Sequence, residues 1–428
     1  MRKGLFVFLS SVLVVSAFAT AETVRIPLGA PQTSLELLSD HGGALSFRAE
    51  IGSIEAMEVA TPEGMFTQLS IPGFHQSMVV GGPELPQMNR LFEIPFGAVT
   101  RVEIHNSRST TVRLADYGME HRVMPAQPSM PKTVDAADWP FIYDASAYGL
   151  DRVSYELVKT TAQGRLRSVD LGLLELAPVE YHPESGELLV HEMVEFTLHF
   201  EGEDPAAGDL LKASTHSPFF SHLYDNIDGY RGLHDSYPDL VRDLVTLAIV
   251  VPAEFEMQIQ DFVDWKIRRG FNVVVGVIGS PEVGSTTSSI QSWVHDLYNS
   301  GTPHEPAPSF VIFIGDVAQC PTFQESGDAT DRPYCDVEGD LVPDIYYGRF
   351  SATNPSQLQA ILDKTMMYDQ FTMPDPGYLG EVVMIAGMDG SYGPTHGNGQ
   401  INYGTEHYFN SAHGIYSHTY LYPASGSN

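Results

Sequence analysis

The chain has 428 residues, 43% of them hydrophobic, which is enough for two domains with ordinary cores. Lys and Arg number 23 against 54 Asp and Glu, so the formal net charge is −31. Such a surface repels nucleic acid and anionic lipid, and we expect neither as a partner. With two cysteines, Cys320 and Cys335, the chain is no disulfide-rich scaffold. A single disulfide that closes the loop between them is one alternative.

The first residues have the pattern of an export signal. Arg2 and Lys3 precede an uncharged apolar run over residues 5–18, and the small residues that a signal peptidase requires follow at positions 19–21. The run is shorter than the roughly 20 residues that span a bilayer. We therefore expect a signal peptide over residues 1–21, a secreted or cell-surface location, and no membrane span in the mature chain.

Residues 22–205 consist of short alternating segments broken by Gly, Pro and Ser, with almost nothing at helical spacing. Alternation over residues 188–200 places Val190 and Val194 on one face. This half is predicted to be antiparallel β structure. One predicted hairpin pairs residues 171–178 with 188–200 around a turn that contains Pro and Gly.

Residues 206–243 have no clear period and are rich in Ser, His, Asp, Tyr and Gly. We expect a linker, the kind of exposed irregular backbone that proteases cut. Lys212 and Arg231 are candidate cut positions, but the sequence does not distinguish them from ordinary solvated charges.

After residue 243, apolar strands alternate with amphipathic helices. The predicted strands are residues 246–251, 272–278, 310–314, 381–386 and 416–421. A helix begins at Asn354 as the cap, with Pro355 in its first turn. This order predicts an α/β unit with a mostly parallel sheet covered on both faces.

Acidic residues follow the predicted strand 310–314, at the sheet edge where function gathers in such folds. Asp316 comes directly after the strand. The later span can offer the carboxylates of Asp340 and Asp344 and the carbonyls of Val337 and Val342 to one hard cation such as Ca²⁺. The spacing is not that of an EF-hand, and a solvated acidic loop is the alternative.

Asp389 follows the predicted strand 381–386, where a carboxylate can orient a catalytic His. The alternative is a turn or cap aspartate. Neither Cys320 nor Cys335 follows a strand as a nucleophile would, so we expect core packing or a disulfide for both.

The order of three motifs in residues 310–350, SFVIFIGD, TDRPY and VEGDLVPDIYYGRFSA, resembles the gingipain-like cysteine peptidases of family C25. The Gly-Gly-Pro-Glu-Leu-Pro stretch at 81–86 and the Tyr-x-Pro-x-x-Gly hairpin at 181–186 resemble the propeptide of that family. The resemblance implies a multidomain chain: a signal peptide (1–21), a β-rich propeptide domain (22–205), a linker that would carry an activation cut (206–243), and the N-terminal part of a caspase-like α/β peptidase domain (244–428).

The family catalyses peptide-bond hydrolysis with a Cys-His dyad, and the resemblance places both residues beyond Asn428. We therefore expect the α/β domain to be incomplete at its C-terminus and these 428 residues to be inactive as a peptidase. Asp389 matches a carboxylate that orients the His. Asn402 stands where members specific for basic residues carry an acidic side chain, which argues against specificity for Arg or Lys.

The resemblance also implies a structural Ca²⁺ with Asp340 and Asp344 as acidic ligands, Val337 and Val342 as carbonyl donors, and Asp316 as a further ligand. The implied partners are protein or peptide substrates, with the propeptide as an intramolecular inhibitor. Two other functions stay open: a C25-type transpeptidase of an outer-membrane secretion system, with the same dyad, and a non-catalytic calcium-dependent adhesin or binding protein.

Overall fold

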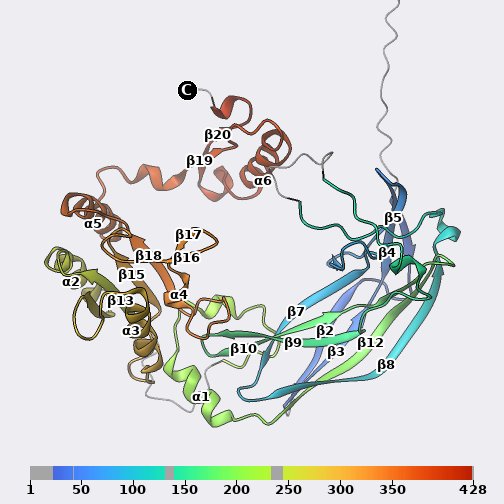
Figure 1. Ribbon diagram of the computed structural model, residues 1–428, viewed down its shortest axis with the longest axis horizontal. Coiled ribbons are helices and arrows are strands. Elements are labelled where there is room, and N and C mark those ends of the chain that lie inside the picture. Colours follow the sequence, from blue (N-terminus) through green and yellow to red (C-terminus); the bar gives the residue numbers. More distant parts are fainter. Residues whose placement is uncertain (1–22, 42, 131–138, 233–243, 427–428) are drawn as a thin grey trace, which may run out of the picture.

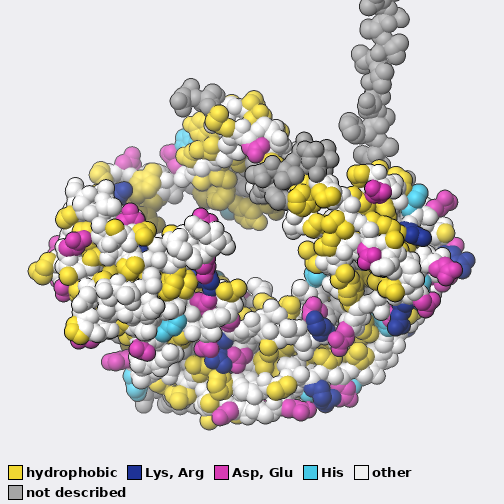
Figure 2. Space-filling model, in the orientation of Figure 1, with side chains coloured by type: hydrophobic (Ala, Val, Ile, Leu, Met, Phe, Trp, Pro, Cys, Tyr) yellow, Lys and Arg dark blue, Asp and Glu magenta, His cyan; other side chains and the backbone are white. Residues whose placement is uncertain are grey.

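The structure, a computed structural model, describes residues 23–41, 43–130, 139–232 and 244–426 (Figure 1). The predicted signal peptide lies outside the described residues, as does the last part of the predicted linker, residues 233–243. Among the helices that are described, none is long and apolar enough to cross a membrane. In the space-filling view the molecule curves around a central opening (Figure 2).

Antiparallel sheets dominate the described part of residues 23–201, which we call the β-rich segment. Its strands are β1 (Val24–Pro27), β2 (Ser34–His41), β3 (Ala44–Glu50), β4 (Ser53–Thr61), β5 (Gly64–Ser70), β6 (His75–Gln76), β7 (Pro86–Ile94), β8 (Val99–Arg113), β9 (Val158–Leu166), β10 (Val169–Leu176), β11 (Val179–His182) and β12 (Glu187–Glu201). They form three sheets, ordered β1-β4-β5, β6-β7-β10-β9 and β11-β12-β3-β2, and β8 also pairs with β12. The predicted antiparallel β structure is confirmed.

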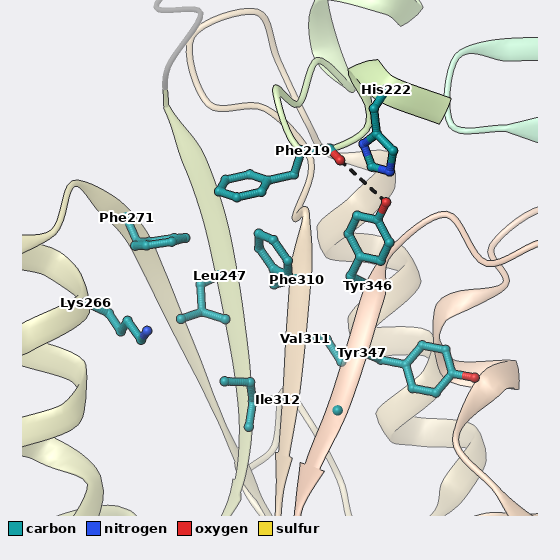
Figure 3. Close-up of a pocket in the computed structure, with 11 residues that line it drawn as sticks. Phe219, His222, Leu247, Lys266, Phe271, Phe310, Val311, Ile312, Tyr346 and Tyr347 are labelled. Atoms are coloured by element: carbon teal, nitrogen blue, oxygen red, sulfur yellow. Dashed lines mark hydrogen bonds between the residues drawn. The ribbon is translucent and has the colours of Figure 1, made fainter. Parts of the chain in front are cut away.

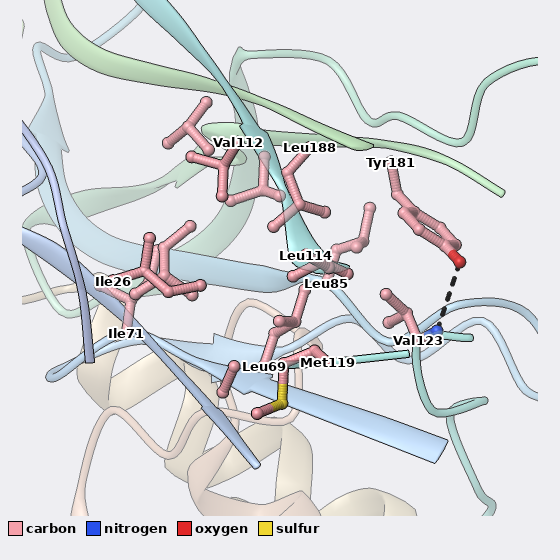
Figure 4. Packing of buried hydrophobic residues seen from close by; sticks show 14 of the residues in the cluster. Ile26, Leu69, Ile71, Leu85, Val112, Leu114, Met119, Val123, Tyr181 and Leu188 are labelled. Carbon is pink, nitrogen blue, oxygen red and sulfur yellow. Dashed lines mark hydrogen bonds between the residues drawn. The ribbon is translucent and has the colours of Figure 1, made fainter. Parts of the chain in front are cut away.

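The inner face of this segment follows from the period of two residues along its strands. Val190 and Val194 of β12 are buried, as their alternation predicts. Val190 and its neighbours join residues from other sheets in one apolar core (Figure 4). Tyr181 lies at the edge of this core, and its hydroxyl accepts the N–H of Val123 at 3.4 Å.

One predicted strand pairing is wrong. The partner of β12 across the turn is β11, with Val179 opposite Val190, whereas β10 lies between β7 and β9 in another sheet. Pro178 separates β10 from β11, and proline has no N–H to continue a ladder. The chain therefore leaves one sheet and enters another at this residue.

The predicted linker begins with a helix rather than with irregular backbone. Helix α1 spans Pro205–Ser214, and the side chain of Asp204 caps it by accepting the N–H of Ala207 at 3.1 Å. An Asp cap followed by Pro at the first helical position is a strong start signal. The two signal residues lie just before the predicted boundary at 206, so treating the stretch up to Ser214 as irregular was wrong.

A four-stranded parallel sheet organises residues 244–426, which we call the α/β segment. Its order is β14-β13-β15-β18, with β13 (Val245–Pro252), β14 (Phe271–Ile278), β15 (Phe310–Ile314) and β18 (Tyr346–Phe350). Helix α3 (Thr287–Asn299) packs on one face, and α2 (Gln260–Arg268) and α5 (Pro355–Asp369) pack on the other. The predicted parallel sheet with both faces covered is confirmed.

The last two predicted strands exist but do not extend this sheet. β19 (Glu381–Ile385) and β20 (Tyr416–Tyr420) pair in parallel with each other as a separate two-stranded sheet. Helix α6 (Asn398–His407) lies beside them, and this group stands apart from the four-stranded sheet (Figure 1). Two short strands, β16 (Phe323–Glu325) and β17 (Asp328–Thr330), and helix α4 (Arg332–Cys335) lie between β15 and β18.

Candidate functional site

The two segments meet where the β9–β10 hairpin reaches the loop of residues 336–344, which we call the acidic loop. The main-chain N–H of Arg165 donates to Oδ2 of Asp340 at 2.5 Å. The N–H of Arg167 donates to Oδ1 of Asp344 at 2.8 Å. Gly164 makes this approach feasible, because a Cβ atom at that position would collide with the Asp340 carboxylate. Two predicted metal ligands, Asp340 and Asp344, therefore accept hydrogen bonds from the main chain of the hairpin.

The remaining oxygens of both carboxylates are occupied from within the acidic loop. Val342 donates its N–H to Oδ1 of Asp340 at 2.9 Å, and Val337 donates to Oδ2 of Asp344 at 3.0 Å. Asp344 is fully buried, and burial raises the pKa of its carboxyl to about 6, against the opposing effect of its N–H donors. The loop is a folded, internally bonded element and not a solvated acidic run.

Of the predicted calcium ligands, Asp316 lies apart from the four in the acidic loop. Asp316 follows Ile314, which pairs with Phe350, whereas Asp344 precedes Tyr346, which pairs with Phe310. Asp316 and Asp344 therefore lie at opposite ends of the sheet, and grouping them around one cation was wrong. Each carboxylate oxygen of Asp340 and Asp344 accepts a main-chain N–H group, and a calcium ion bound by these two side chains stays a prediction. In the described part of the chain, no group of three or more His, Cys, Asp or Glu side chains is arranged to hold a metal ion.

The carboxyl edge of the sheet is organised by Arg349, which lies within the Gly-Arg-Phe motif. Its guanidinium pairs with Asp331 at 2.7 Å and donates to the carbonyls of Gly315 and Cys320, each at 2.9 Å. Gly315 has a φ of +103°, which only glycine adopts readily, and this turn carries the chain into Asp316. The sequence marked this region but not the tie between Arg349 and Asp331.

Both cysteines are free, fully buried thiols in the core beneath α3. Burial raises the pKa of Cys320 to about 11 and that of Cys335 well above its ordinary value. A nucleophile must be a thiolate, so neither side chain is suited to attack a peptide carbonyl. Of the two alternatives that the sequence left open for them, the structure has core packing and not a disulfide.

Asp389 caps a turn. Its Oδ1 accepts the N–H groups of Ser391 and Tyr392 at 2.8 and 2.9 Å, and these bonds lower the pKa of its carboxyl. The side chain is exposed. A role in orienting a catalytic His stays a prediction.

Of the two candidate cut positions, Lys212 is enclosed. It lies in α1, its side chain is 12% exposed, and its Nζ donates to Oε1 of Glu93 at 2.5 Å and to the carbonyl of Arg231. Arg231 donates its N–H to Oε2 of Glu93 at 2.6 Å. A protease cannot bind a helical, ion-paired Lys212, whereas Arg231 lies just before the residues that are not described.

An apolar cavity of about 580 Å³ lies at the amino ends of β13, β15 and β18 (Figure 3). Phe219, Phe271, Phe310 and Tyr346 surround it, and the Tyr346 hydroxyl donates to the carbonyl of Phe219 at 3.5 Å. The charged group in its lining is Lys266, which is paired with Asp369. His222 also lines the cavity, and most of the other lining side chains are aromatic or aliphatic, which suits packing.

Two family models match the chain: the C25 propeptide over residues 29–214 and peptidase family C25 over residues 243–426. They follow one another along the β-rich and α/β segments. The chain belongs to peptidase family C25, and its first half is of the propeptide type.

Among curated relatives, Lys-gingipain of Porphyromonas gingivalis is 33% identical over 99% of this chain and 24% of its own length. Gingipain R2 of the same organism is 24% identical over 91% of this chain and 51% of its own length. The chain thus spans about a quarter of the length of the first and half of the second. A solved structure described as showing zymogenic latency of gingipain K matches 42% of this chain at 31% identity, with a TM-score of 0.41.

Proposed function

We propose that the whole protein is an exported precursor of a gingipain-type cysteine endopeptidase. In this proposal, residues 22–205 are a propeptide domain and residues from 244 onward belong to a caspase-like peptidase domain. The observation that carries the proposal is the burial of a propeptide hairpin in the peptidase segment, through Arg165 to Asp340 and Arg167 to Asp344. This docking holds the propeptide on the peptidase segment, where it would act as an intramolecular inhibitor.

The reaction is hydrolysis of a peptide bond in a protein or peptide substrate. A Cys thiolate attacks the carbonyl carbon, main-chain N–H groups stabilise the oxyanion, and a protonated His gives its proton to the amine that leaves. Water, deprotonated by the same His, then attacks the resulting thioester and releases the acid product and the Cys. Cys320 and Cys335 take no part, because burial keeps both as neutral thiols. Asp389 is the proposed orienting carboxylate for the His, and its Oδ1 is fixed by the turn that it caps.

A structural Ca²⁺ is a further part of this proposal, with Asp340 and Asp344 as its acidic ligands. Each of their oxygens accepts a main-chain N–H group, and a carboxylate offers about four lone-pair sites in all, so the hairpin contacts do not use up its capacity.

The test is a peptidase assay on the product of the whole gene, with a mixed peptide library, before and after a cut introduced between residues 232 and 244. We expect a latent precursor, activity after the cut and removal of the propeptide, and loss of that activity with a thiol-alkylating reagent. Transfer of the acyl group to an added amine instead of water would make the protein a transpeptidase. Absence of both reactions after propeptide removal would overturn the proposal.

The matched control is the same chain with C320A and C335A. These variants should keep whatever activity the whole protein has, since neither thiol is a nucleophile. Loss of thiol-dependent cleavage in either variant, with the fold intact, would contradict the assignment of both cysteines to the core.

A further inference from the structure

The tip of the β9–β10 hairpin carries an arginine that is more deeply buried than any other arginine among the described residues. Arg167 is 1% exposed and has a φ of 56°, a conformation that is uncommon for residues other than glycine. It occupies the two-residue connection between Leu166 and Val169. A buried charge in an unfavourable backbone conformation requires strong compensating contacts.

Main-chain carbonyls provide those contacts. Nε and Nη2 donate to the carbonyl of Thr215 at 2.9 and 2.7 Å. Nη1 donates to Pro308 and Asp344 at 2.9 and 2.7 Å, and Nη2 also donates to Ala307 at 3.3 Å. A guanidinium has five N–H groups, so each has a partner here.

Two aromatic rings complete the surroundings of the guanidinium. Its central carbon lies 4.6 Å from the ring centre of Phe220 and 5.3 Å from that of Tyr298. Thr215 and Phe220 precede residue 232 and so lie on the same side of the predicted cut as Arg167. We call the set that the α/β segment contributes, Tyr298, Ala307, Pro308 and Asp344, the Arg pocket. A lysine has three donors on one nitrogen and cannot reproduce a planar fork of this kind.

The Arg pocket lies at the end of the sheet opposite the expected catalytic edge. Pro308 lies two residues before the start of β15, and Asp344 lies two residues before the start of β18. Loops that carry function in a parallel sheet converge at the carboxyl ends of its strands, which here means Gly315 and Asp316. The hairpin tip therefore contacts the α/β segment away from where substrate would bind.

We propose that the Arg pocket is an exosite at which the peptidase segment recognises its own propeptide, and that Arg167 keeps the two fragments associated once the connection between residues 232 and 244 is cut. This inference rests on the proposed function, because that function is what makes one part a propeptide and the other a peptidase. Removal of the guanidinium would leave the buried carbonyls of Ala307, Pro308 and Asp344 without donors, which is costly. A fully desolvated arginine surrounded by well-packed rings is typical of a binding hot spot.

The test uses the full chain with a recognition sequence for a specific protease placed between residues 232 and 244. After cleavage, fragments of the wild-type sequence should co-elute in gel filtration. Fragments carrying R167K or R167M should separate, with dissociation about 30-fold faster or more. The matched control is R152M, which removes an exposed arginine paired with Glu180 on the same segment and should leave co-elution unchanged.

Separation of the wild-type fragments after the cut would overturn the proposal, as would co-elution of the R167M fragments. If circular dichroism shows that the Arg167 variants fail to fold, hydrogen exchange measured on the cleaved wild-type protein tests the proposal instead. The amides of Arg165 and Arg167 must then stay protected, and their rapid exchange in co-eluting fragments would show that another surface holds them. Because both readouts measure association, they do not depend on peptidase activity, and a failure of the proposed function is detected separately.

Discussion

The main-chain N–H of Arg167 donates to Oδ1 of Asp344 across 2.8 Å, although the two residues are 177 positions apart in the chain. Through its other oxygen, the same carboxylate accepts the N–H of Val337 at 3.0 Å. One fully buried side chain thus holds both the β-rich segment and the acidic loop. The docking of the two segments and the conformation of the loop depend on the same residue.

Replacing this side chain should therefore be costly. D344A removes the acceptor for two buried N–H groups, and we expect the free energy of unfolding to fall by about 3 kcal/mol. The measurement is urea unfolding followed by fluorescence or circular dichroism. E338A is the control, because Glu338 makes a 3.3 Å pair with Arg165 and its side chain is 37% exposed, and we expect a loss below about 1 kcal/mol. Equal losses in the two variants would mean that Asp344 is no anchor.

Arg349 offers a second test, at the carboxyl edge of the sheet. R349M leaves the carboxylate of Asp331, which is 13% exposed, without its partner, and it frees the carbonyls of Gly315 and Cys320. Removing one member of a largely buried ion pair costs about 3 kcal/mol. We expect a corresponding decrease in the free energy of unfolding, with the double variant R349M/D331N recovering part of it. A double variant no more stable than R349M would contradict the pairing as the cause.

Local patterns in the sequence predicted elements well. Phe310–Ile314 is predicted to the residue, because a continuous apolar run bounded by Ser and Gly-Asp admits few other assignments. Long-range pairing was less predictable. β10 and β11 are both apolar and both adjacent to the turn, and only the proline between them indicates that β11, not β10, is the partner of β12.

The site was also only partly predictable, because its contacts join residues that are far apart in the chain. Motif order marked residues 310–350 as important, and the structure places Arg349, Asp340 and Asp344 there in ordered roles. Nothing local distinguishes Arg167 from the solvated arginines of other hairpins, since its partners Ala307 and Asp344 are far away in the chain. A residue whose environment is made by main-chain carbonyls and aromatic rings that are distant in the sequence leaves no pattern in its own neighbourhood.

The two thiols give a chemical test of the core. Because burial raises the pKa of Cys320 to about 11 and raises that of Cys335 well above its ordinary value, both should react with iodoacetamide far more slowly than a free cysteine at neutral pH. Mass spectrometry of the native chain should find neither modified, and both modified after denaturation in urea. Rapid labelling of either residue in the native state would place it outside the core.

A pH dependence is expected from Glu93, which lies in β7 and is 5% exposed. Burial raises the pKa of its carboxyl above the ordinary value of 4.5, in spite of the opposing charges of Lys212 and Arg231. In the pH range between those two pKa values, the folded chain binds more protons than the unfolded chain. This group therefore makes the free energy of unfolding fall as the pH rises through that range, starting just above 4.5.

E93Q removes this contribution, because a glutamine does not titrate. The difference in free energy of unfolding between the wild type and E93Q should decrease as the pH rises above 4.5, measured by urea unfolding at fixed salt. E187Q is the matched control: Glu187 is paired with Arg113, and that hydrogen bond lowers the pKa of its carboxyl, so its contribution has the opposite sign. A difference for E93Q that grows with pH would mean that attraction by Lys212 outweighs burial, and that the ionised pair, not its desolvation, governs how α1 is held to β7.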